Sequence, residues 1–453
     1  MDSGRWAIGS TSDAVTAPEQ TSGAGPLLSH VRSLAAVDLA RMRSLAAPPA
    51  RRVELDREAT NRLLSALVAH SWRAVDQLVA EGRRRAAERT PLGFLHHVLT
   101  HSRFRRGPRR HFPLAALRDR VGRFVTAGEP VPVALQGFPF KHCDNGLKAA
   151  GPLPDLGDLG AVLRLVELQR ACTAYYPPGL DVMVMADGGY FRPRAPADLH
   201  RYRTALWRLE ELAGLGGALR WRIKRDVIAE SLGTAAARRE EYVRDYQELI
   251  DERVRPYAAR HDAAAADEPL ASVLPERTPR FSGLYRSLLY SVPVPSPNGE
   301  VGPEWSRRVL ADLPGDGRHV PAAVRLARRA VLRRAWDATV EYLAVLAADL
   351  RCRVDQALPP HLRLRSGLTG PGELGLTYLG GSTLLPWHGT GCVDERGQVA
   401  VDFRVVLHDR GMVPVHTPST GPRQPFAMVP SAYVTPDDDL APELLRRIRL
   451  RRR

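Results

Sequence analysis

Two of the three lysines in the chain lie in one irregular loop. Lys141 and Lys148 belong to residues 137–155, a stretch broken by glycine and proline that has neither helical nor strand periodicity. The third is Lys224, although lysine and arginine together number 65, so arginine is the usual cation here. A lysine amine can bind a phosphate or act at a ketone carbon. The alternative is an ordinary surface lysine, which the scarcity of lysine elsewhere weakens.

Two other segments place ionisable groups at turns. Asp187 follows the alternating run 180–186 and begins an Asp-Gly pair, and His388 stands between Trp387 and Gly389. A carboxylate at a strand end can hold a substrate ammonium, and an imidazole can act as acid or base near neutral pH. Each has a structural alternative, namely a common turn pair and a histidine bonded to a turn carbonyl.

A histidine pair and the cysteines bear on metal binding. His97 and His101 are four residues apart and would share a helix face, as metal ligands can. No third ligand can be pointed to, so we predict partly exposed helix histidines and no metal site. The four cysteines are far apart and form no CxxC pair, which indicates reduced thiols in a cytosol.

Helices and strands alternate around the lysine loop. The apolar spacing predicts a helix over 114–127, a buried strand over 130–136, a helix over 156–172 and a strand from 180 that ends at Asp187-Gly188. Gly128 can end the first helix, and Asp155 can cap the next. This order is typical of a βαβ unit with both loops on one edge. In such sheets, ligands gather where loops leave the carboxyl ends of strands.

Long helices are predicted on both sides of this unit. One begins at Thr60 or Asn61 and ends near Arg85, and charged helical sequence fills 196–260. A further long helix lies within 320–360, and we expect four of its arginines to form a solvated face, from which one could reach into a cleft: Arg325, Arg328, Arg329 and Arg333. After Pro360, short alternating runs between glycines indicate β-hairpins, one of them turning at 394–398.

The predicted fold class is α/β, with a mixed central sheet covered by long helices and a hairpin-rich C-terminal part. We expect strands of this C-terminal part to join the central sheet as well. We expect a largely disordered lead over 1–50 and a single catalytic domain over 51–440, with a helical subregion at 196–350. Residues 441–453 are a basic tail that we expect to fray.

Composition and charge bear on whether the chain is a membrane, secreted or nucleic-acid-binding protein. The 453 residues are 44% hydrophobic and 25% charged, without an apolar run of the ~18 residues that a membrane helix needs. The N-terminus lacks the features of a secretory signal, so we predict a cytoplasmic protein. A net charge of +15 would suit nucleic acid. However, the near absence of lysine favours arginine-rich coding as the source of the charge, and no nucleic-acid reader motif accompanies it.

Three segments together resemble a known family. They are "GEPVPVALQGFPFKHCDNGLKAAGPLPDLGD", "YYPPGLDVMVMADGGYF" and, later, "PWHG". Their order and spacing resemble the pyoverdine/dityrosine biosynthesis family, which includes the isonitrile (isocyanide) synthases. The similarity runs from about residue 114 to 191 and again from about 320 to 400. The motifs are specific as a set, although no single one is.

The resemblance implies a reaction. Bacterial members of the family join the amine of tyrosine or tryptophan to the ketone of ribulose 5-phosphate, and one carbon remains as the isonitrile. No metal or redox cofactor is implied. The implied partners are small-molecule substrates, with an iron/2-oxoglutarate oxygenase acting next on the product, and neither a membrane nor nucleic acid.

The resemblance also carries over site residues. It implies three catalytic residues: Lys141, Asp187 and His388. It implies five substrate-binding residues: Phe138, Lys148, Asp155, Arg363 and Trp387. On this hypothesis the two lysines meet a phosphate or ketone, Arg363 meets a carboxylate or phosphate, Asp187 meets the amine, and His388 is the acid or base.

The chain departs from the family pattern in several places. It reads "RLRSGLTG" where the family often has "RLSIHP", so no histidine follows Arg363 at that spacing. It reads "KHCDN" for "KSPNP" and "FRPRAPA" for "FSDLVGV". Two alternatives therefore stay open: a divergent member that uses another amine or carbonyl donor, and a member that binds a small amine or sugar phosphate without catalysis.

Overall fold

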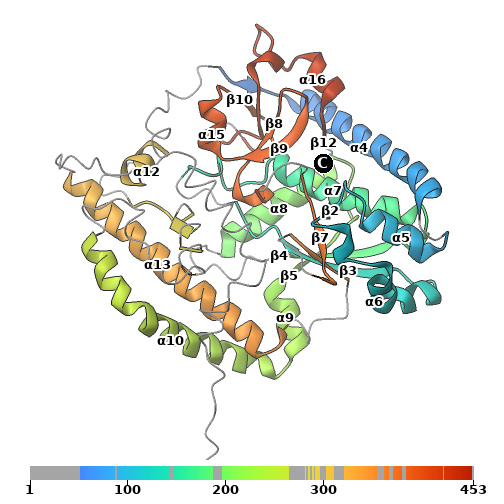
Figure 1. Ribbon diagram of the computed structural model, residues 1–453. Coiled ribbons are helices and arrows are strands. Elements are labelled where there is room, and N and C mark those ends of the chain that lie inside the picture. Colours follow the sequence, from blue (N-terminus) through green and yellow to red (C-terminus); the bar gives the residue numbers. More distant parts are fainter. Residues whose placement is uncertain are drawn as a thin grey trace, which may run out of the picture. The chain divides into compact units, whose positions relative to one another are not determined.

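A computed structural model (Figure 1) describes residues 51–450, except 87–88, 142–145, 187–195, 265–280, 282–283, 286–287, 290, 296–302, 311–320, 355–361, 367–370, 380–383 and 422. The described residues divide into two compact units. One comprises residues up to 231 together with those from 362 onward, and the other lies within 232–354. Among the described residues, no helix is both long enough and apolar enough to cross a lipid bilayer.

The first unit contains the predicted βαβ arrangement. Its central sheet has the order β2-β7-β6-β3-β4-β5. The strands are β2 (Arg105–Arg106), β3 (Val131–Gly137), β4 (Leu180–Ala186), β5 (Arg220–Ile223), β6 (Leu362–Arg365) and β7 (Leu374–Leu376). β3 and β4 are parallel and in register from Val131↔Leu180 to Gly137↔Ala186, so both strands end at the same edge. The mixed α/β class is confirmed.

The described helices in the N-terminal part of this unit are α4 (Arg57–Arg85), α5 (Pro91–Leu99), α6 (Leu114–Ala127), α7 (Leu156–Thr173), α8 (Pro196–Leu212) and α9 (Lys224–Leu232). Every residue of α7 from Leu156 to Leu168 is buried. It contacts α4, α5 and α8, and it also contacts strands of two different sheets. This explains why its sequence is apolar on nearly every face rather than amphipathic.

The helix ends follow local chemistry. α6 ends at Gly128, whose φ of 70° suits glycine, as predicted. Asp155 caps α7, also as predicted, and Asp158 completes a capping box. The predicted start of α4 at Thr60 or Asn61 is wrong by about one turn. Asp56 caps the helix instead, because its carboxylate accepts a hydrogen bond from the Ala59 amide at 2.7 Å.

The C-terminal strands form a second sheet of their own, in the order β1-β10-β11-β8-β9-β12. Its strands are β1 (Val53–Glu54), β8 (Thr390–Val393), β9 (Gln398–Asp402), β10 (Val413–His416), β11 (Ala427–Val429) and β12 (Arg449–Leu450), with the short helix α15 (Arg404–Asp409). The predicted hairpin around 394–398 is confirmed by β8 and β9.

Two expectations about this region are corrected. Of the late strands that the structure describes, only β6 and β7 join the central sheet, and they pair in parallel rather than as a hairpin. Glycine spacing shows where strands end but not which strands pair, because register depends on distant partners. The tail is ordered up to Leu450: α16 (Pro442–Arg447) is followed by β12, which pairs in parallel with β9.

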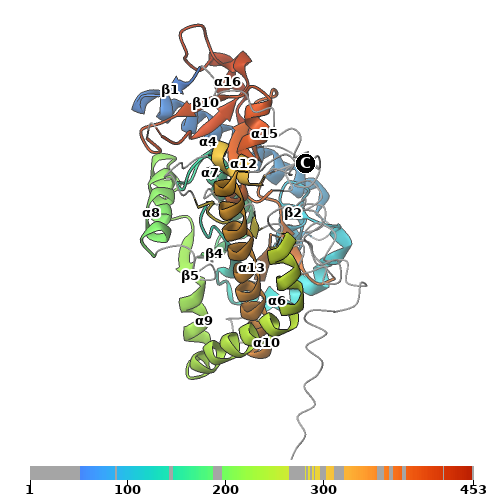
Figure 2. The ribbon, with the colours of Figure 1, turned by 90° about the vertical axis from the view of Figure 1, so that its left-hand side faces the viewer.

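The second unit is helical. α10 (Ala235–Ala264) and α13 (Ala322–Arg351) run alongside each other in both views (Figures 1 and 2), and α12 (Pro303–Leu310) contacts α13. Arg239 of α10 forms an ion pair with Asp349 of α13 at 2.7 Å. The predicted solvated arginine face is wrong for Arg328, which is fully buried, whereas Arg329 is exposed. Adjacent residues differ by ~100° around a helix, so the two face different surroundings.

The ordered tail generates a prediction. A variant that ends at Ala441 loses α16 and β12, which bury Leu444, Ile448 and Leu450. We expect its unfolding free energy to fall by several kcal/mol, since each such side chain contributes about 1.5–3 kcal/mol. Urea unfolding measures this. A variant that ends at Leu450 removes only the three terminal arginines, and equal stability of the two variants would contradict the packing of the tail.

Candidate functional site

Aromatic rings close over the carboxyl end of β3. Gly137 ends the strand, and Phe138 follows with a left-handed φ of 53°, fully buried. The Phe138 ring lies 5.3 Å from that of Trp221, 5.9 Å from that of Tyr378 and 5.1 Å from that of Trp387. A Cβ on Gly137 would approach Trp387 Cη2 to 2.9 Å, so only glycine fits beneath the rings.

Lys141 joins three segments that are far apart in the sequence. Its Nζ lies 2.9 Å from Asp155 Oδ2 and 2.8 Å from Asp158 Oδ2, and it donates to the carbonyls of Pro386 at 2.8 Å and Gly389 at 2.9 Å. The side chain is fully buried. Burial alone would lower the pKa of Lys141, but the two carboxylates outweigh it and raise that pKa above its usual value. The ammonium therefore stays charged.

The carboxylates in this cluster are themselves hydrogen-bonded. Asp155 accepts from the amides of Gly157 at 2.8 Å and Gly391 at 3.0 Å. Asp158 accepts from the Asp155 amide and from the Tyr202 hydroxyl, both at 2.9 Å. Each carboxylate oxygen thus has a donor, so the start of α7 and the strand after the "PWHG" turn are held rigidly together.

The "PWHG" turn carries the candidate acid–base residue. Pro386–His388 forms one turn of 3₁₀ helix, closed by a hydrogen bond from the His388 amide to the Leu385 carbonyl at 2.9 Å. The His388 ring is half-buried and stands perpendicular to the Trp387 indole, with centroids 6.2 Å apart. Because Lys141 binds the carbonyls on both sides of this Trp-His pair, the structure brings Phe138, Lys141, Asp155, Trp387 and His388 together.

Lys148 lies beside the same turn in a different environment. Its carbonyl accepts from the Arg404 amide at 2.9 Å and from the Thr390 hydroxyl at 3.5 Å. Thr390 lies two residues after His388. The Lys148 side chain is buried, and burial lowers its pKa to about 7. A substantial fraction of this amine is therefore neutral at physiological pH, as an attacking or proton-accepting amine must be.

Arg363 lies apart from this group, and the position of Asp187 is not described. Arg363 is half-buried on β6, where it pairs with Ala134 in the middle of β3, so its backbone lies back from the carboxyl edge. Asp187 lies outside the described residues. It directly follows Ala186, which is the register partner of Gly137.

Two groups near the site have no local signal in the sequence. Tyr202 and Tyr378 reach the site from α8 and from the segment after β7. A second buried cluster lies on α7, where Glu167 accepts two hydrogen bonds from Arg103 and one from Arg164. The Asp155–Asp158 spacing is a capping-box signal that could have indicated a second buried carboxylate.

His97 and His101 do not share a helix face, because α5 ends at Leu99. Their rings lie 5.8 Å apart, and burial lowers the pKa of both. Among the described residues, no three histidine, cysteine or carboxylate side chains are arranged to hold a metal ion.

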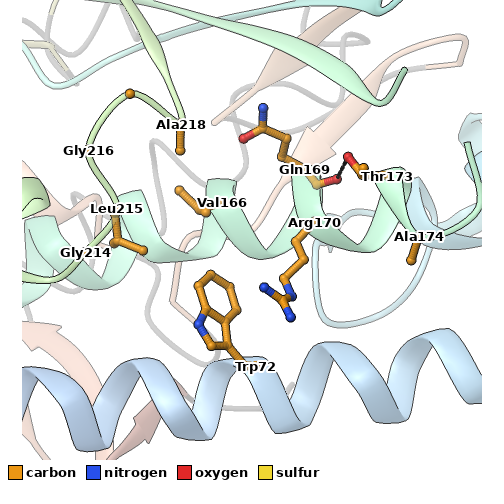
Figure 3. Close-up of a pocket in the computed structure, with 11 residues that line it drawn as sticks. Trp72, Val166, Gln169, Arg170, Thr173, Ala174, Gly214, Leu215, Gly216 and Ala218 are labelled. Atoms are coloured by element: carbon orange, nitrogen blue, oxygen red, sulfur yellow. Dashed lines mark hydrogen bonds between the residues drawn. The ribbon is translucent and has the colours of Figure 1, made fainter. Parts of the chain in front are cut away.

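A cavity of about 630 Å³ lies elsewhere in this unit (Figure 3). Trp72 of α4, the end of α7 from Val166 to Ala174, and residues 214–218 line it. The Arg170 guanidinium lies over the Trp72 ring, 4.7 Å from its centroid. This cavity is at the opposite end of α7 from Asp155, and none of the predicted site residues lines it.

Part of the chain is similar to a known protein family. Residues 121–287 match the sequence profile of the family described as "Pyoverdine/dityrosine biosynthesis protein". This match covers less than half of the chain. The match includes β3, the lysine loop, α7 and β4, which are the elements that build the site.

Individual relatives match over shorter regions. An L-tyrosine isonitrile synthase from Xenorhabdus nematophila is 28% identical over 140 residues, which cover 31% of this chain and 39% of that protein. The isocyanide synthase-NRPS hybrid crmA from Aspergillus fumigatus is 38% identical over 68 residues, or 15% of this chain and 4% of the relative. The chain thus spans well under half the length of either relative.

A solved structure gives a looser match. The crystal structure of the PvcA protein from Pseudomonas aeruginosa aligns with a TM-score of 0.47 and 19% sequence identity, covering 74% of this chain and 99% of that one.

The Lys141 cluster generates a stability prediction. Lys141→Met leaves the Asp155 and Asp158 carboxylates buried without their cation, so we expect unfolding free energy to fall by about 3–5 kcal/mol. Chemical denaturation measures the loss. The matched control is Arg410→Met, which removes an exposed partner of Asp402 and should cost no more than about 1 kcal/mol. Similar losses in the two variants would refute the structural role of Lys141.

Lys148 generates a pH-dependent prediction. Its pKa is about 7 when folded and about 10.4 when unfolded, so the unfolded chain binds more protons between these values. The stability cost of this lysine is therefore full below pH 7 and disappears as pH rises towards 10.4. We expect Lys148→Met to stabilise the protein most at pH 7, with an advantage that shrinks by at most about 1.4 kcal/mol per pH unit. Urea unfolding between pH 6.5 and 9.5 tests the slope, and a constant difference would contradict it.

Proposed function

We propose that the chain is an isonitrile synthase-like enzyme that joins an amino-acid amine to the ketone of a sugar phosphate, with tyrosine or tryptophan and ribulose 5-phosphate as the substrates. One observation supports this most strongly. The lysine loop, the start of α7 and the "PWHG" turn resemble the family, and Lys141 ties all three at the carboxyl end of β3. That edge is where ligands bind in parallel sheets.

The chemistry makes three demands on the protein. The attacking amine must lose a proton, imine formation needs protons to be moved, and the phosphate and carboxylate need cations or hydrogen-bond donors. His388 is held at a fixed orientation against Trp387 and is half-exposed, which suits an acid–base role. Lys148, with a pKa near 7, can hold or release a proton in the same pH range.

The roles of the two lysines differ in this proposal. Two carboxylates and two carbonyls surround the Lys141 ammonium within 2.9 Å. A phosphate there would have to displace them, so we assign Lys141 the role of positioning the histidine turn. Lys148 has the lowered pKa that a reacting amine requires, and we assign it to the ketone or the phosphate. Asp187 remains our candidate for the substrate ammonium, and Arg363 for an anion.

A product assay tests the proposal. The purified protein is incubated with tyrosine or tryptophan and ribulose 5-phosphate, and the isonitrile is sought by mass and by infrared absorption. We expect His388→Ala to reduce turnover by at least about 100-fold, since acid–base groups contribute on the order of 10²–10⁴. Arg170→Ala, in the remote cavity of Figure 3, is the control and should leave turnover unchanged.

The negative outcomes differ in meaning. A blank with every proteinogenic amino acid would exclude the isonitrile reaction and favour another amine or carbonyl donor. Product formation with full turnover in His388→Ala would keep the reaction but remove this histidine from it.

A further inference from the structure

The Tyr378 hydroxyl is a buried polar group that forms no hydrogen bond of good geometry with the described residues. The residue is 4% exposed, and its Oη has no hydrogen-bond partner among the described residues. Burial raises the pKa of this phenol, and the Arg106 charge and the nearby Ser366 side chain lower it only in part, so the hydroxyl keeps its proton. The Ser366 side chain is close enough to affect the phenol, but it does not form a hydrogen bond of good geometry with it. An unsatisfied buried hydroxyl costs stability, and phenylalanine would fill the same space without that cost.

The position of this hydroxyl is set by rigid neighbours. The Tyr378 ring is 5.5 Å from that of Trp387 and 5.9 Å from that of Phe138, nearly perpendicular to both. Its carbonyl accepts from Arg164 Nε at 3.2 Å, and the preceding Thr377 amide donates to the Phe104 carbonyl at 2.6 Å. With the ring wedged and the backbone anchored, the phenol has little freedom to turn towards another partner.

The hydroxyl lies at the carboxyl edge of the central sheet. A Cβ on Gly137, the last residue of β3, would lie 3.0 Å from Tyr378 Oη. Ser366 directly follows the end of β6, the parallel neighbour of β3. Its side chain is near enough to this hydroxyl to lower the pKa of the phenol. Arg106 donates to the Ser366 carbonyl. A proton donor and a guanidinium therefore lie where two parallel strands end.

We propose that Tyr378 is a substrate-binding residue, whose hydroxyl donates a hydrogen bond to an anionic oxygen of the substrate beside the Arg106 guanidinium. A phenol O–H and a guanidinium are both donors to carboxylates and phosphates, so either substrate of the proposed reaction can supply the oxygen. The inference rests on the proposed function for the identity of these substrates. It concerns binding, and no covalent step involves Tyr378.

The test compares Tyr378→Phe with the wild-type protein in two assays. Calorimetry measures the binding of tyrosine and of ribulose 5-phosphate separately, and the product assay gives KM and kcat. We expect affinity for one of the two ligands to fall about 10- to 100-fold, as for a lost hydrogen bond to a charged group. A carboxylate contact raises KM for tyrosine, whereas a phosphate contact raises KM for the sugar. Thermal stability should be unchanged or higher.

Ser366→Ala is the matched control. If the hydroxyl serves only to contact Ser366, the two variants should show the same small changes in stability and activity, and that result would overturn the inference. On our proposal Ser366→Ala keeps ligand binding within about twofold, because it leaves the Tyr378 hydroxyl in place.

The outcomes separate this inference from the proposed function. Product formation with unchanged binding in Tyr378→Phe overturns the inference and leaves the function standing. Ligand binding without product, weakened in Tyr378→Phe, supports the inference and removes the function. Wild-type protein that binds neither ligand overturns both.

Discussion

A single buried ammonium organises the candidate site. Lys141 Nζ lies within 2.9 Å of two carboxylates and two carbonyls that belong to segments up to 248 residues away in the chain. Taking a lysine and two aspartates out of water is costly, and the arrangement is tolerable only because every carboxylate oxygen also receives another hydrogen bond. Such a network adds little stability over an apolar core. What it provides is a fixed geometry, since few other arrangements satisfy all its members.

This constraint explains features that otherwise look unrelated. Gly391 must be glycine because a Cβ there would lie 2.3 Å from the Gly157 amide nitrogen, at the point where Asp155 joins the two segments. Gly389 is similarly close to Asp402. The strand after the histidine turn can therefore approach the start of α7 closely enough to share the carboxylate. These backbone contacts, rather than contacts of its own side chain, determine where His388 lies.

The sequence predicted the local parts of this arrangement and not its long-range contacts. Apolar alternation located β3 and β4, and helical periodicity with the Asp155 cap located α7, because those signals arise from neighbours along the chain. The partners of Lys141 could not be derived, since nothing in a lysine's local sequence shows which distant carbonyls it will meet. The resemblance brought Lys141, Asp155 and His388 into one hypothesis, but it did not indicate that the lysine would be enclosed by carboxylates. Tyr378 has no local signature at all.

The two lysines of the loop show how burial alone does not determine the chemistry of a side chain. Both are removed from water, yet the pKa of Lys141 is raised and that of Lys148 is lowered to about 7. The difference lies in the Asp155 and Asp158 carboxylates, which offset desolvation for the first lysine only. One amine is thereby kept charged as a structural anchor, while the other, seven residues on, can be neutral near physiological pH. A short loop thus supplies both a rigid support for the histidine turn and an amine that changes its charge near neutral pH.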